Sequence, residues 1–113
     1  MTHEGKRILE VDLTRCSAAE LERTVRNVPD HVMKEPLASV CMLVDFTGAA
    51  FDAEALRTMK ETAIFDKPYI KKTAWIGVGS LPASHRDAVS DYSRREFPVF
   101  TSRAEALEWL AKD

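Results

Sequence analysis

The apolar positions of this chain fall into four short segments that alternate with four helical patterns. Residues 7–13 alternate between apolar and acidic side chains, which is typical of a strand with one face in water. Residues 40–46 begin with five apolar residues in a row, as expected for a strand buried on both faces. Residues 73–78 predict a third strand, and residues 97–100 predict a short fourth strand.

Polar residues at helix-start positions mark where the helices begin. Ser17 and Ser102 are each followed three residues later by glutamate, the spacing of a capping box in which the two side chains satisfy unpaired backbone N–H groups. Asp52 predicts the cap of the second helix, and Ser84 predicts the start of the third. The residues expected to face the core from the last three helices are Leu56, Met59, Ala63, Ala88, Val89, Tyr92, Ala106, Leu107 and Leu110.

The first helical pattern contains an internal proline. An apolar stripe runs from Leu21 to Val32, and Pro29 interrupts it without shifting its phase. Because proline removes a backbone hydrogen bond from a helix, we expect a kinked or two-piece helix that ends at residues 35–36.

The alternation of strands and helices predicts an α/β fold with a mainly parallel sheet of four to five strands built from four right-handed βα units. Nothing in residues 1–113 resembles a linker, so we expect a single domain with an ordered core of about residues 7–111. In such sheets the strand C-termini and helix N-termini share one edge, and ligands bind there.

Three stretches, residues 42–52, 66–78 and 100–110, resemble those of bacterial STAS-like domains, small proteins related to the antagonists of anti-sigma factors. The likeness extends over about residues 7–110. It implies a superhelix of βα turns with sequential strand order, and a role in binding other proteins.

The resemblance also points to a difference at the second helix. In the sigma-regulating members a serine follows the aspartate at this helix start, and phosphorylation of that serine switches partner binding. Here Ala53 follows Asp52, and Glu54 already places a negative charge at the helix start. We therefore expect no phosphorylation at this position.

Composition and charge exclude several classes of protein. The chain has 113 residues, 45% of them hydrophobic and 30% charged, which is ordinary for a globular domain. A net charge of −2 offers no general attraction to nucleic-acid phosphates, so nucleic acid is not an expected partner. No apolar run is long enough to span a membrane and no leader pattern is present, so the expected location is the cytoplasm.

The cysteines, Cys16 and Cys41, are far apart in sequence, and Cys41 is expected to be a buried free thiol.

Several polar residues are expected near the carboxyl ends of the strands and are candidates for contact with a ligand or partner. They are Asp45, Thr47, Asp52, Gly79 and Ser80. The stretch Gly77–Pro82 either forms a tight turn or contacts an anion, but it lacks the third glycine of a dinucleotide site and the lysine of a P-loop.

Catalytic and metal sites find little support in the sequence. Asp12, with Asp45 and Asp52, falls near the same edge, where carboxylates can bind Mg²⁺, but Asp52 already has a role as a helix cap. His85 and Asp87 are two residues apart on a predicted helix and point in different directions, so a triad with Ser80 is not expected. The three histidines are isolated, and no cysteine completes a zinc spacing. We expect no catalytic residue, no metal and no cofactor.

Three functional hypotheses remain from the sequence. The first is a non-catalytic protein-interaction or regulatory module that binds a protein partner or a second copy of itself. We expect this contact on the sheet face opposite the crossover helices, or on an adjoining helix, because an apolar sheet face is seldom left in water. The alternative is a domain that binds a small anionic molecule or a lipid at the strand-end edge. An unrecognised hydrolase is the lesser alternative.

A group of basic residues is either a solvated face or a surface for an acidic partner. These residues are Lys67, Lys71, Lys72, Arg94 and Arg95.

Overall fold

The computed structural model describes residues 2, 3 and 5–112, with side chains described for residues 5 and 7–112. Strands and helices alternate along the chain, as the apolar pattern predicts. In order they are β1 (Thr2–His3), β2 (Lys6–Asp12), α1 (Ala18–Val32), β3 (Val40–Asp45), α2 (Ala53–Asp66), the 3₁₀ turn η1 (Lys67–Tyr69), β4 (Ile70–Ile76), the 3₁₀ turn η2 (Val78–Ser80), α3 (Ala83–Ser93), β5 (Val99–Phe100) and α4 (Arg103–Ala111).

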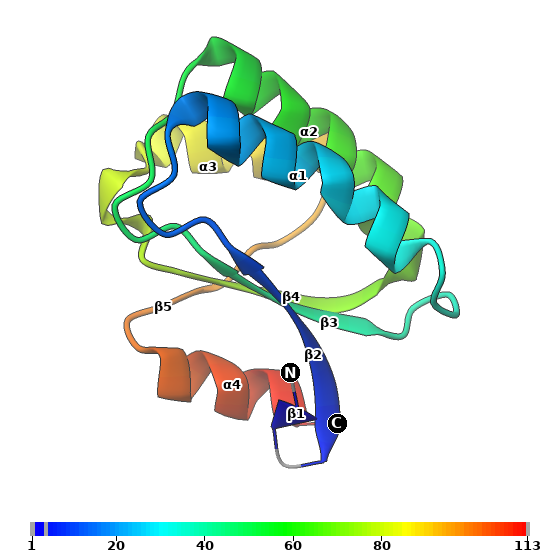
Figure 1. The fold of residues 1–113 in the computed structure, drawn as a ribbon. Helices are drawn as coiled ribbons and strands as arrows, with labels where there is room; N and C mark the ends of the chain where they lie inside the picture. The colour runs from blue at the N-terminus through cyan, green and yellow to red at the C-terminus, as the bar shows by residue number, and fades with distance from the viewer. Residues whose placement is uncertain (1, 4, 113) are drawn as a thin grey trace.

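The strands form one sheet in the order β1-β2-β3-β4-β5 (Figure 1). Strands β2 to β5 are parallel to one another, and β1 pairs antiparallel to β2. The predicted α/β class and mainly parallel sheet are therefore confirmed. The order of the strands follows the sequence, which the resemblance to STAS-like domains also implies.

The central strand β3 is buried on both faces, as its unbroken apolar run predicts. Val40, Met42 and Val44 pack into a core cluster with α1, α2 and α3. Cys41 and Leu43, which alternate with them, pack into a second cluster on the other face. Both cysteines of the chain are free thiols.

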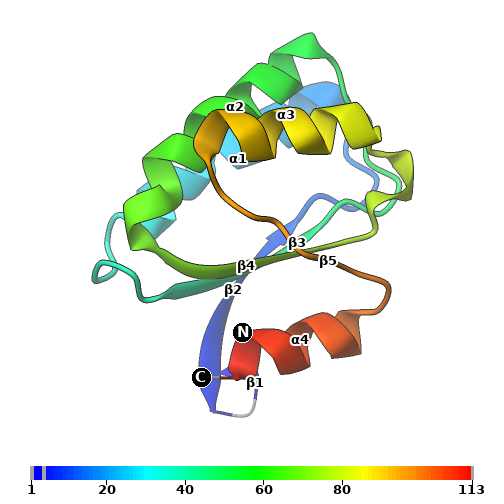
Figure 2. The same cartoon turned by 180° about the vertical axis from the view of Figure 1, so that it is seen from behind.

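Helix α4 lies alone on the face of the sheet opposite the other three helices (Figures 1 and 2). Its residues Ala106, Leu107 and Leu110 are buried against Leu43 and Ala74 of the two central strands. The sequence predicts that loops, a second copy or a partner cover this face, whereas the last helix of the chain itself covers it. A crossover helix between two parallel strands is confined by handedness to one face, but α4 follows the last strand and has no such constraint.

Two helix predictions also need correction. Helix α1 runs unbroken from Ala18 to Val32 with Pro29 inside its last turn, so it is a single helix and ends before residues 35–36. Pro29 is so near the helix end that few backbone hydrogen bonds of the helix come after it. The buried apolar stripe through Val28 and Val32 keeps this last part of the helix packed. Helix α3 begins at Ala83 with Pro82 as its N-cap, one residue earlier than Ser84 predicts.

The strand boundaries differ from the predicted ones by up to three residues. Strand β4 begins at Ile70 and not at residue 73, because Ile70 pairs with Val40 before a register shift in β3. Strand β5 is limited to Val99 and Phe100. No helix of the described residues has the length and apolar character needed to cross a membrane.

Candidate functional site

The five candidate residues all lie along the edge where the parallel strands end. Asp45 ends β3, Thr47 follows it, and Asp52 precedes α2. Gly79 and Ser80 lie in η2, directly after β4. The fold thus brings these residues to one edge, as the sequence predicts, and their hydrogen bonds show what each one does there.

Asp45 and Thr47 are bound to each other. The Thr47 backbone N–H donates to Asp45 Oδ1 at 3.0 Å, and the Thr47 hydroxyl donates to the same oxygen at 2.6 Å. This turn lies against Gly77, whose φ of +67° is in the left-handed region. A Cβ atom at Gly77 would approach Thr47 Oγ1 to 2.2 Å and Asp45 Oδ1 to 2.8 Å. The carboxylate is therefore part of a close-packed turn, a role that the sequence pattern did not reveal.

The loop after β4 is tied to the loop after β3 by Ser80. Its hydroxyl donates to the backbone carbonyl of Ala49 at 2.9 Å. Gly79 is exposed, and no atom lies within 4 Å of the place where its Cβ would be. Of the two glycines in this loop, Gly77 is thus the one that the turn requires. The contacts of Gly77 and Ser80 agree with the tight-turn interpretation of this stretch.

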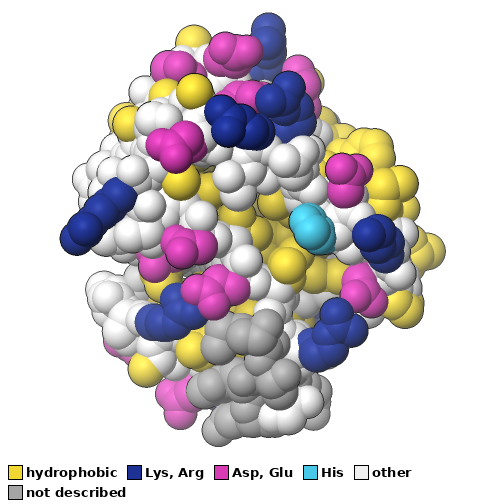
Figure 3. Space-filling view, viewed as in Figure 1, with side chains coloured by type: hydrophobic (Ala, Val, Ile, Leu, Met, Phe, Trp, Pro, Cys, Tyr) yellow, Lys and Arg dark blue, Asp and Glu magenta, His cyan; other side chains and the backbone are white. Residues whose placement is uncertain are grey.

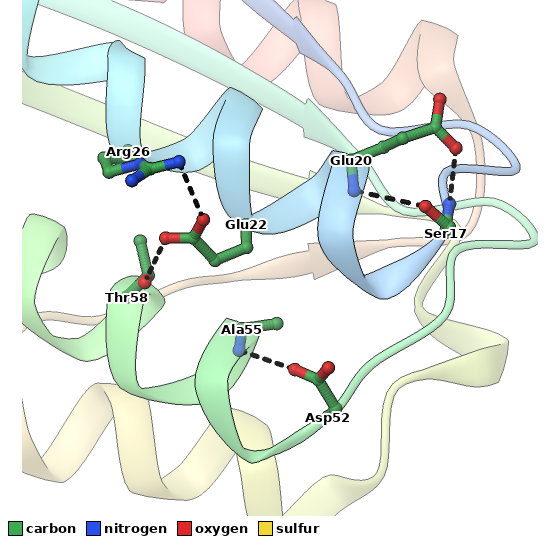
Figure 4. A network of polar contacts seen from close by, with 7 residues as sticks. All are labelled: Ser17, Glu20, Glu22, Arg26, Asp52, Ala55 and Thr58. Carbon is green, nitrogen blue, oxygen red and sulfur yellow. Dashed lines mark hydrogen bonds and ion pairs between the residues drawn. The ribbon is translucent and has the colours of Figure 1, made fainter.

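The start of α2 is occupied by a helix cap (Figure 4). Asp52 accepts a hydrogen bond from the Ala55 backbone N–H at 2.7 Å, as predicted. Ala53, the exposed residue that follows Asp52, is the first residue of the helix. The Thr58 hydroxyl, one turn further along, is buried and donates to Glu22 of α1 at 2.7 Å.

The same view shows how α1 begins. Ser17 and Glu20 form the complete capping box that the sequence predicts, with backbone-to-side-chain bonds of 3.0 and 3.2 Å (Figure 4). The Glu22 carboxylate that accepts from Thr58 also pairs with Arg26 at 3.1 Å. The facing starts of α1 and α2 are therefore joined by polar contacts between side chains of this chain.

The acidic side chains at the ends of β2 and β3 lie near a cation from α4. Asp12 is the register partner of Asp45 and accepts a hydrogen bond from the Thr14 backbone N–H at 3.0 Å. Hydrogen bonds with Thr14 hold the pKa of Asp12 below its usual value. Arg103 pairs with Glu10, and this bond raises the pKa of Arg103, with a further contribution from the charges of Asp45 and Asp12.

The side chains that were weighed as catalytic or metal-ligating candidates have other contacts at this edge. Among the described residues, no group of three or more His, Cys, Asp or Glu side chains could hold a metal ion. The Ser80 hydroxyl donates to a backbone carbonyl, and the buried Nδ1 of His85 has no hydrogen-bond partner. The His85 ring instead lies edge-on to Phe51 at 6.4 Å between ring centroids.

Four exposed apolar side chains belong to the segments at the other end of the strands, before β3 and β4. They are Met33, Leu37, Ile64 and Phe65, exposed by 50, 70, 45 and 53%. We call these four residues the apolar patch. The sequence could have indicated this exposure. Ile64 and Phe65 are apolar, but they fall outside the stripe of α2 residues that is predicted to face the core.

Comparison with known proteins adds no relative. No protein-family model, curated protein sequence or solved structure matches this chain.

Proposed function

We propose that this domain is a non-catalytic protein-interaction module that binds a second copy of itself through the apolar patch. The observation that carries the proposal is the exposure of four large apolar side chains at one end of the molecule. A cluster of this kind is a common mark of a protein contact surface. Figure 3 shows hydrophobic side chains gathered on the right of the molecule, where α1 and α2 end in Figure 1.

The two segments of the patch are held together by the backbone. The Ala38 N–H donates to the Pro68 carbonyl at 2.9 Å, and the Ser39 N–H donates to the Tyr69 carbonyl at 3.1 Å. The loop after α1, which carries Leu37, therefore lies against the turn after α2. A surface fixed in this way needs little ordering when a partner binds, which lowers the entropic cost of association.

Charges of both signs near the patch favour a second copy as the occupant. Lys34 follows Met33, and Glu61 precedes Phe65 by one helical turn. Across a two-fold axis each patch meets an identical patch, so a lysine from one copy can pair with a glutamate from the other. A patch surrounded by one sign of charge would repel its own copy.

The side chains at the strand-end edge are consistent with a non-catalytic module. Its candidate residues are engaged in turns and caps within the chain, and the hydroxyl, imidazole and carboxylate groups nearby do not form a nucleophile–base pair. The resemblance to STAS-like domains agrees with a module that acts by binding. With Ala53 at the serine position, the module would act without that phosphorylation switch.

Sedimentation equilibrium over a wide range of protein concentration tests this proposal. The native chain is expected to dimerise, and Phe65→Asp is expected to remain monomeric because it places a charge at the centre of the contact. Ala104→Asp adds the same charge at an exposed site in the first turn of α4 and should leave the dimer unchanged. A native chain that is monomeric at every concentration, or a Phe65→Asp protein that dimerises as well as the native chain, would contradict the proposal.

A further inference from the structure

A small cavity lies between the sheet and the layer formed by α1, α2 and α3. Its volume is about 60 Å³. Most of its wall is apolar and includes Val28, Met42, Met59 and Trp75. At the volume that one buried water needs, it has room for roughly four waters, or for a molecule of about four or five non-hydrogen atoms.

One end of this cavity is polar. Asp66, at the end of α2, is only 4% exposed, and its Oδ1 atom has no hydrogen-bond partner. Arg95 lies at the same end, with its guanidinium donating to the Ala63 carbonyl at 2.9 Å and to the Thr73 hydroxyl at 2.8 Å. The Thr62 hydroxyl also lines the cavity, and it donates to the Thr58 carbonyl at 2.9 Å.

Arg95 holds this end of the cavity together. Besides its two hydrogen bonds, its guanidinium lies over the Phe97 ring at 4.8 Å from the centroid, and Phe97 stacks on Trp75 at 4.5 Å. The side chain thus bridges α2 and β4 near Asp66, whose Oδ1 atom has no hydrogen-bond partner. Burial raises the pKa of Asp66 to about 7, and the charge of Arg95 opposes that rise.

A buried polar atom without a partner is unfavourable, and native proteins almost always satisfy such atoms with protein, water or a ligand. Water fits only part of this space. A buried water needs two to four polar partners, and the polar groups here stand at one end while the remaining wall is apolar. The arrangement matches a molecule that has an apolar body and one polar end.

We propose that this cavity binds a small uncharged molecule with a short aliphatic body and a single hydroxyl group, such as a short-chain alcohol. The hydroxyl donates a hydrogen bond to Asp66 Oδ1, and the aliphatic part lies among Val28, Met42 and Met59. A cation would meet Arg95 and an anion would meet Asp66, so a neutral ligand suits both groups. The site lies inside the domain and does not depend on the apolar patch.

The test uses 1-propanol as the probe and NMR of the folded chain as the readout. Saturable shifts are expected at the methyl groups of Met42, Met59 and Val28. The dissociation constant should lie at about 0.1–10 mM, because a ligand of four heavy atoms cannot bind much more tightly. 1-Propanethiol, which has a similar shape but is a poor hydrogen-bond donor, should bind roughly ten-fold more weakly.

Variants at Asp66 identify the polar contact. Asp66→Ala is expected to abolish the preference for the alcohol over the thiol, while Asp91→Ala, at an exposed site on α3, should preserve it. If Asp66→Ala fails to fold, Asp66→Asn keeps the shape and should reduce the preference. Shifts that do not saturate, an equal affinity for the two probes, or a preference unchanged in the folded Asp66 variant would overturn the proposal. So would a high-resolution structure in which the cavity holds water alone at saturating 1-propanol.

Discussion

At the scale of single residues, Gly77 has a structural role that its neighbour Gly79 does not share. The backbone of Gly77 lies against the Asp45–Thr47 turn in a left-handed conformation, where a side chain is both strained and obstructed. Around Gly79 the structure leaves open space. The two glycines, separated by one residue, therefore form a matched pair for a substitution experiment.

We predict that Gly77→Ala lowers the free energy of unfolding by about 1–3 kcal/mol, because the turn must shift to admit the methyl group. Gly79→Ala should change it by less than about 0.5 kcal/mol. Urea denaturation of both variants gives the comparison. Equal effects of the two substitutions would show that the turn is not packed as the structure has it.

Asp66 predicts an unusual dependence of stability on pH. Its pKa is raised from 3.8 to about 7 in the folded protein by burial, despite the nearby charge of Arg95. Between these two pH values the folded chain holds more protons than the unfolded chain, so the free energy of unfolding must fall as the pH rises. The fall should be on the order of 2–4 kcal/mol between pH 4 and pH 7, with little further change above that window.

Urea denaturation at a series of pH values measures this dependence. Asp66→Asn should remove most of the fall, and Asp91→Asn, at an exposed position, should keep it. Asp12 and Glu20 act in the opposite direction, because hydrogen bonds lower the pKa of each, and their contribution is lost only as the pH falls below about 4. A native protein that becomes more stable from pH 5 to pH 7 would contradict the assignment to Asp66.

At the scale of elements, the start of α2 combines a helix cap with hydroxyl groups that are hydrogen-bonded within the chain. The hydroxyl groups between residues 47 and 58 belong to Thr47 and Thr58. Each donates a hydrogen bond to a carboxylate of this chain, and Thr58 is buried as well. A kinase would have to break these contacts to reach either oxygen.

We therefore predict that protein purified from its native host carries no phosphate from Thr47 to Thr58. Intact-mass and peptide mass spectrometry measure this directly. Stoichiometric phosphate on either threonine would contradict this prediction and would show that the start of α2 opens in the cell.

How much the sequence reveals depends on whether a feature is local. The capping residues Ser17 and Asp52 could be predicted because a cap involves only neighbouring backbone groups. The buried strand from Val40 could be predicted from its apolar run. The close approach of Gly77 to Thr47 could not, because it depends on how two loops meet in space.

The face of the sheet that α4 covers could not be predicted for a similar reason. The apolar residues Ala106, Leu107 and Leu110 identify a helix with a buried side, but they do not say which face of the sheet that side covers. The cavity beside Asp66 was missed because its polar wall joins α2, β4 and the segment after α3. An aspartate at the end of a helix ordinarily lies in water, and nothing in its neighbours marks it as buried.

At the scale of the whole molecule, both sheet faces are covered within one chain, so the proposed contact surface is not a face of the sheet. Helix α4 supplies the second layer (Figure 2), and the apolar patch remains exposed where α1 and α2 end. The strand-end edge lies at the opposite end of the strands from this patch. We propose that two copies of the domain associate through this patch.

The most direct measurement is an isotope-filtered NOE experiment on a mixture of labelled and unlabelled chains, which detects only contacts between different copies. We predict contacts from the methyl groups of Met33, Leu37 and Ile64 in one copy to the Phe65 ring of the other, and their loss in Phe65→Asp. A concentrated native sample with no contact between copies, or with contacts confined to α4 or to the strand-end edge, would contradict the account.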